Sequence, residues 1–252
     1  MQKICFLLLN FRRSSASGVG RYLLRVVPKI FLMLLMLASA QGQTAWTRGA
    51  GTNDWQTAGN WNNGLPAGNF TGIQNGNTVQ LNTGTATTDT LTIRLFSELN
   101  VSNGADLNTQ LFSIGSSSTA TVLVSGAGTT VTSSLISLGA VSGNGTLTIE
   151  NSALVTTTTA ATNTFVLGNN NGTGQLNLNS GGILATNSVT IGSAGSGAVD
   201  FDGGTLRGTT NNTEIFSGGF GTGDITLLAG GGTIDTNSFN LGTAQIIDGT
   251  GA

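Results

Sequence analysis

Apolar and polar residues alternate in short stretches that recur along the chain from about residue 99. Each stretch is a triplet whose first and third residues are apolar and whose middle residue is mostly polar. The triplets recur at intervals of 23 to 29 residues and end at Val101, Val124, Ile149, Leu178, Phe201 and Leu227. Because successive residues of a strand point to opposite sides, the pattern predicts short strands with one buried face and one solvent face.

A second motif, Ile or Leu followed by Gly, closes most of these units. It begins at Ile114, Leu138, Leu167, Ile191 and Leu241, with Phe216-Ser217 in the remaining position. A period of about 20 to 50 residues is typical of stacked repeats. We therefore expect a parallel β-helix of about six turns over residues 85–252. Glycine at a unit end fits a corner that needs a positive φ or tight packing.

The composition supports an all-β fold and excludes several kinds of chemistry. The chain has 39 glycines and 8% charged residues, and its polar residues are mostly Thr, Ser, Asn and Gly. Thr and Val favour strands, whereas Gly and Asn favour turns. The chain has no histidine, which excludes a Ser-His-Asp triad and any His-ligated metal site. Its one cysteine is Cys5, so residues 41–252 have no thiol chemistry.

The first 40 residues predict a secretory signal peptide. Six of the nine basic residues lie here, and the apolar run 30–37 leads into Ala38-Ser39-Ala40, a small-x-small cleavage pattern. The run is shorter than the roughly 20 residues of a membrane span. We expect cleavage after Ala40, with an uncleaved anchor as the alternative. The protein would then be exported through the inner membrane and secreted or held at a bacterial cell surface.

Residues 41–252 are acidic, with three arginines, no lysine and eleven carboxylates, for a formal charge of −8. Binding to a phosphate backbone needs clustered Lys and Arg, so this composition excludes nucleic acid as a partner. It argues equally against electrostatic adhesion to anionic lipid.

Residues 41–84 do not follow the repeat and contain all three tryptophans, Trp46, Trp55 and Trp61. An open solenoid end exposes unpaired strand groups, and natural solenoids cover it with an atypical unit. Large aromatic side chains suit that task, so we interpret this segment as an N-terminal cap. The alternative is a glycan-binding site in which the Trp rings stack on sugars.

Several units resemble a known kind of exported repeat. Residues 145–155, residues 174–184 and the Val122–Thr129 stretch are similar to repeats of autotransporter (type V secretion) passenger domains and of PEP-CTERM-associated proteins. The segment from Asp54 to Pro66 resembles the stretch after the signal in such proteins. The resemblance implies a right-handed β-helix, often large and adhesive. Such proteins end in a translocating barrel or a sorting helix, so we expect this chain to be part of something longer.

An enzyme is the alternative from a different class, because β-helices also house polysaccharide lyases and glycosidases. Glycoside hydrolysis usually needs two carboxylates about 5–9.5 Å apart. Asp200 and Asp202 could supply them on one outward strand face, with Glu150 nearby and Arg207 as the closest base in sequence. The simpler interpretation is that both are solvated residues beside a turn. Residues 221–224 only faintly resemble a calcium turn, and we expect no metal or cofactor.

These observations favour an exported, non-enzymatic β-solenoid with a structural or adhesive role. Its partners would be surface glycans or a host or neighbouring cell surface. The remaining hypotheses are a carbohydrate-active enzyme and a glycan-binding module. The candidate binding residues are Trp46, Trp55, Trp61, Asp200 and Asp202.

Overall fold

The computed structural model describes residues 43–158 and 164–249, and the predicted signal peptide lies outside these ranges. The described chain is all-β, with one short 3-10 turn, Ala58–Asn60. Its strands pair in parallel and wind into a β-solenoid of about eight turns. The predicted fold class is confirmed, although the turn number exceeds the expected six.

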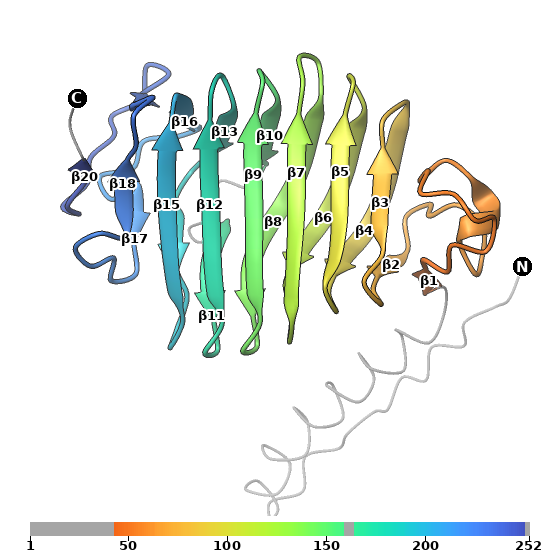
Figure 1. Ribbon diagram of the computed structural model, residues 1–252. Helices are drawn as coiled ribbons and strands as arrows, with labels where there is room; N and C mark the ends of the chain where they lie inside the picture. The colour runs from red at the N-terminus through yellow and green to blue at the C-terminus, as the bar shows by residue number, and fades with distance from the viewer. Residues whose placement is uncertain (1–42, 159–163, 250–252) are drawn as a thin grey trace, which may run out of the picture. The chain divides into compact units, whose positions relative to one another are not determined.

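The predicted triplets form one eight-stranded sheet, which we call the front sheet (Figure 1). Leu99 pairs with Val122, and the first residues of later triplets continue the same column. These residues are buried, and the middle residues between them are only partly buried, as predicted. The strands are β3 Thr78–Leu81, β5 Ser97–Ser102, β7 Thr119–Ser125, β9 Asn144–Glu150, β12 Thr173–Asn179, β15 Ser196–Asp202, β18 Ile225–Leu227 and β20 Asp248–Gly249.

The remaining strands form a twelve-stranded sheet. Its members are β1 Thr44–Ala45, β2 Phe70–Ile73, β4 Thr85–Ile93, β6 Asp106–Ile114, β8 Thr130–Ala140, β10 Leu154–Thr157, β11 Phe165–Asn169, β13 Ile183–Thr186, β14 Val189–Ile191, β16 Gly204–Gly208, β17 Phe216–Ser217 and β19 Gly232–Asp235.

Its three longest strands contain an irregularity at Asp89, Gln110 and Ser134. The ladder pairing skips these positions, and two consecutive residues that are not buried interrupt the alternation there. In later turns two separate strands replace each long one. We call the part before this point (β10, β13, β16, β19 and the first halves of β4, β6 and β8) the second face. The part after it (β1, β2, β11, β14, β17 and the second halves) is the third face.

Buried hydroxyl groups follow the boundary between the second and third faces. Thr109 Oγ1 donates to the carbonyl of Leu111 at 3.0 Å, and Ser133 Oγ donates to that of Leu135 at 2.9 Å. These two hydroxyls each satisfy a carbonyl where the ladder is interrupted, which offsets the cost of burying both groups. The sequence analysis missed this column because a polar residue inside the core breaks simple alternation. Its members are Thr88, Thr109, Ser133, Thr157 and Thr186. The hydroxyls of Thr157 and Thr186 bond to each other at 2.8 Å, whereas that of Thr88 has no hydrogen-bond partner among the described residues.

The repeat extends further toward the N-terminus than residue 85. Val79 and Leu81 of β3 pair with Leu99 and Val101, so Val79-Gln80-Leu81 is a triplet that the sequence analysis did not recognise. Together with β2, it adds to the stack before the predicted boundary and accounts for part of the larger turn number.

The last units depart from the predicted register. Phe216 pairs with Val189, whereas the predicted alignment placed it beside Ile191. Leu241 forms a bridge with Asn212, so its Leu-Gly motif does not continue the third face. The prediction was wrong for these two motifs. A Leu-Gly pair is too short to fix a register when the intervening loops vary in length.

Glycines at two predicted unit ends have both a positive φ and tight packing, as expected for a corner. Gly139 and Gly168 have φ values of 68° and 56°. A Cβ on Gly139 would overlap the carbonyl of Thr173, and one on Gly168 would overlap that of Ser196. Only glycine accommodates the left-handed conformation and the close backbone approach together.

Candidate functional site

The acidic pair lies on the outward side of the front sheet. Asp200 and Asp202 in β15 are partly buried and alternate with the buried Val199 and Phe201. The two carboxylates therefore share one strand face, as the alternation predicts. Side chains at i and i+2 of a strand start about 7 Å apart, so their spacing alone would permit a catalytic pair.

Both carboxylates already accept hydrogen bonds from the adjacent turns. Gln175 Nε2 donates to Asp200 Oδ2 at 3.0 Å. The backbone N–H of Gly230 donates to Asp202 Oδ1 at 2.7 Å. Each carboxylate thus links two turns of the solenoid, which gives it a structural task that needs no substrate.

Glu150, the third predicted acid, lies two strands away from Asp202. Asn179 stands between them, pairing with Asp202 and donating to Glu150 Oε2 at 3.4 Å. Ser125 Oγ donates to the other oxygen of Glu150 at 3.2 Å. The sheet therefore separates the two acids with a neutral amide and does not bring them together.

Carboxylates elsewhere in the described ladders follow the same arrangement. Asp106 accepts from Thr130 Oγ1 at 2.5 Å and from Thr85 Oγ1 at 3.4 Å, on either side of it. Glu98 accepts from Thr78 Oγ1 at 3.3 Å. Like charges directly opposite one another would destabilise the sheet, whereas a neutral donor satisfies the carboxylate. The signal for this arrangement was in the sequence, as Thr, Ser, Asn or Gln one turn away from an acid.

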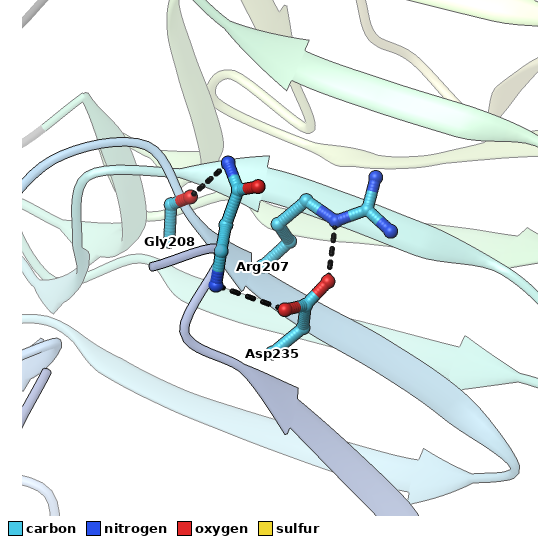
Figure 2. Close-up of polar contacts among 4 residues, drawn as sticks. Arg207, Gly208 and Asp235 are labelled. Carbon is cyan, nitrogen blue, oxygen red and sulfur yellow. Dashed lines mark hydrogen bonds and ion pairs between the residues drawn. The ribbon is translucent and has the colours of Figure 1, made fainter. Parts of the chain in front are cut away.

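Arg207, the base closest in sequence to the acidic pair, is engaged on a different face. It extends from β16 on the second face, and its Nε donates to Asp235 Oδ2 at 2.7 Å (Figure 2). Asp235 belongs to β19, the next strand of that face. The guanidinium and the backbone N–H of Asn237 both lower the pKa of Asp235 from its ordinary value. Arg207, although the closest base in sequence, therefore does not lie with the acidic pair.

The three tryptophans form one buried cluster at the start of the solenoid. Trp46, Trp55 and Trp61 expose 2%, 1% and 4% of their surface. Trp61 packs edge-on against both others, with ring centroids 4.9 and 4.8 Å apart. Its Nε1 donates to the carbonyl of Trp55 at 2.8 Å. These rings have no open face for a sugar, so the structure contradicts the stacking hypothesis for them.

The same segment pairs with the edge of the front sheet. The backbone N–H of Trp55 donates to the carbonyl of Gln80 at 2.8 Å, and that of Gln80 donates to Asn53 at 2.7 Å. Gln80 belongs to β3, the first strand of the sheet. Residues 53–55 therefore satisfy a strand edge that would otherwise be open, which is the task expected of a cap.

The described residues contain no group of three or more His, Cys, Asp or Glu side chains arranged to hold a metal ion. In the weak calcium candidate, Asp224 Oδ2 accepts from the backbone N–H of Gly221 at 2.6 Å, which closes a local turn. Within the described part of the chain, no helix is long and apolar enough to cross a membrane.

Comparison with protein-family models, with curated proteins and with solved structures gives no match for this chain.

Proposed function

We propose that the protein is an exported, non-enzymatic β-solenoid with a structural or adhesive role at the bacterial cell surface or outside the cell. One observation carries the proposal: outward carboxylates are used in hydrogen bonds between turns. Asp200 and Asp202, the acids best placed for catalysis, each accept such a bond. A solenoid surface of this kind offers long rows of Thr, Ser and Asn to a partner.

The sequence supports export independently of the fold. The basic and apolar leader ends in Ala38-Ser39-Ala40, and residues 41–252 lack cysteine and histidine. The resemblance to autotransporter passenger and PEP-CTERM-associated repeats points to the same location. The proposed partners are surface glycans or neighbouring cells, contacted through the rows of Thr, Ser and Asn on the outward strand faces.

Export can be tested by expressing the full chain in a bacterium and sequencing the N-terminus of the protein outside the inner membrane. We expect it to start at Gln41. A matched control, Leu34→Arg, places a charge in the apolar run and should hold the chain in the cytoplasm. Unprocessed wild-type chain in the cytoplasm would contradict the export part of the proposal.

Adhesion is tested separately by comparing attachment of cells that display the wild-type chain with that of cells carrying the Leu34→Arg variant. We expect greater attachment to glycan-coated surfaces with the wild type. Equal attachment would contradict the adhesive role and leave the export result unaffected. Incubation with polyuronides and neutral glycans should release no product. Product formed by the wild type and lost in Asp200→Asn/Asp202→Asn would instead establish the enzyme alternative.

A further inference from the structure

Five exposed asparagines of the solenoid are each followed by glycine, and such a pair is chemically labile. The backbone nitrogen of the glycine attacks Cγ of the asparagine, and ammonia leaves as a succinimide ring closes. Water then opens the ring and leaves aspartate or isoaspartate. The five pairs begin at Asn63, Asn75, Asn103, Asn144 and Asn171. The structure sets the first of them apart from the other four.

In four of the pairs the fold holds the glycine nitrogen in place. The N–H groups of Gly76 and Gly172 donate to backbone carbonyls at 2.7 and 3.1 Å, and that of Gly104 donates to Thr129 Oγ1 at 3.0 Å. The Asn144 pair lies within β9, which is paired with a strand on each side. Each of these nitrogens must leave its turn or ladder before it can reach Cγ, which slows the reaction.

The Asn63-Gly64 pair lies in the cap, between the 3-10 turn and β2, and belongs to no strand. Asn63 is exposed and Gly64 is half-buried. Among the described residues, the N–H of Gly64 donates no hydrogen bond that fastens this turn. A Cβ on Gly64 would meet no atom within 4 Å, so the glycine also has open space beside it. Here the attacking nitrogen is not restrained as it is in the other pairs.

Asn63 and its neighbour Asn62 fasten the first strand of the solenoid. Asn63 Nδ2 donates to the carbonyl of Gln43 at 2.7 Å. Asn62 Oδ1 accepts from the backbone N–H of Ala45 at 2.8 Å, and the N–H of Asn62 donates to the carbonyl of Ala45 at 3.1 Å. Conversion of Asn63 to an acid removes the donor to Gln43 and turns a carboxylate toward a carbonyl oxygen. The segment that leads into Trp46 thereby loses one of its attachments.

We propose that Asn63 is a site of spontaneous deamidation that loosens β1 as the protein ages. The nitrogen of Gly64 forms a bond to Asn63 Cγ, the bond from Cγ to Nδ2 breaks, and ammonia leaves. Water then hydrolyses the succinimide to aspartate or isoaspartate. The product adds one negative charge to the formal −8 of residues 41–252. The change is irreversible, so it accumulates with time, and it does not depend on whether the protein is exported or adhesive.

The first test measures the rate at each pair. The full chain is incubated in warm, mildly alkaline buffer, and aspartate and isoaspartate are quantified by peptide mapping with mass spectrometry. We expect conversion at Asn63 to be at least about fivefold faster than at the other four pairs, because those must first give up a hydrogen bond. In denaturant the five rates should converge. Equal rates in the folded chain, or a preference for Asn63 that persists in denaturant, would overturn the proposal.

The second test measures the effect on the first strand. Asn63→Asp reproduces one product of the reaction and should speed amide hydrogen exchange in β1 relative to the wild type. The matched control Asn103→Asp makes the same change of charge in an exposed turn between β5 and β6 and should leave exchange in β1 unchanged. Circular dichroism confirms that both variants are folded. Unchanged exchange in β1 of Asn63→Asp, or an equal increase in the control, would overturn the proposed loosening.

Discussion

The regular turns and the last turns of the solenoid use the same strand pairing but bury their residues very differently. Leu206 in β16 and Ile234 in β19 are register partners in one column of the second face. Leu206 is fully buried, whereas Ile234 exposes 38% of its surface. Hydrogen bonding to one neighbour places a strand correctly, but burial of its inward residue also needs the elements packed around it.

The N-terminal end solves the same problem with aromatic residues. Trp46, Trp55 and Trp61 are buried there, and residues 53–55 pair with β3. At the other end β19 is mostly exposed, and Ile246 exposes more than half of its surface. The comparison indicates that stability along the solenoid is set by the covering of each turn.

The largest expected effect is a charge placed in a covered turn. Ile149→Asp buries an unpaired carboxylate in β9 and should destabilise the fold by several kcal/mol, about 3–5. Thr148→Asp, next to it but outward, should cost about 1 kcal/mol or less. Chemical denaturation with matched m-values measures both. Equal losses would show that the inward and outward assignment is wrong.

The second prediction concerns the aromatic end. Trp61→Ala removes the ring that joins Trp46 and Trp55 and should cost about 3–5 kcal/mol. Trp61→Phe keeps an aromatic ring but loses the bond from Nε1 to the carbonyl of Trp55, so it should cost less. In Trp61→Ala, amide hydrogen exchange should become faster than in the wild type first in β1 to β3. Loss of protection from exchange confined to β18–β20 would contradict the capping role.

The third prediction uses the register pair directly. Leu206→Ala should cost about 2–5 kcal/mol because it leaves a cavity in a closed core. Ile234→Ala should cost about 1 kcal/mol or less, because much of its side chain already lies in water. The difference in unfolding free energy between the two variants measures the effect of covering. Equal costs would mean that Ile234 is covered in solution.

The regular turns were also where sequence reasoning succeeded. The alternating triplets predicted the front sheet because each inward residue is stacked on a similar one, as Leu147 is on Leu176. Phe216 and Leu241 were misplaced because the loops before them vary in length, and a two-residue motif is too short to fix a register. The sequence predicted that the tryptophan segment caps the solenoid. It could not predict that Trp55 pairs with β3, because a capping role does not fix which residues pair.

The candidate site was less predictable than the fold. Alternation placed Asp200 and Asp202 on one outward face, but it gave no information about their partners. Gln175 lies 25 residues before Asp200, and Gly230 lies 28 residues after Asp202. Only the exact length of each turn brings these groups together. Similarly, Arg207 is near Asp202 in sequence, yet it points outward from another face and pairs with Asp235.

The smallest expected effect is the pH dependence of the Arg207–Asp235 pair, which joins the last covered strand to the exposed β19. The folded pKa of Asp235 lies below the ordinary value of 3.8, chiefly because of its hydrogen bond from Arg207. The stabilisation is therefore present above about pH 4 and is lost as the pH falls through the folded pKa. The melting temperature of the wild type should be slightly higher than that of Asp235→Asn at pH 7. This difference in melting temperature should vanish in stronger acid. Because the pair is exposed, added salt should reduce the difference at pH 7. In an Arg207→Gln background, Asp235→Asn should have a smaller effect at pH 7. A difference between wild type and Asp235→Asn that persists unchanged in acid would show that the carboxylate charge does not connect β16 to β19.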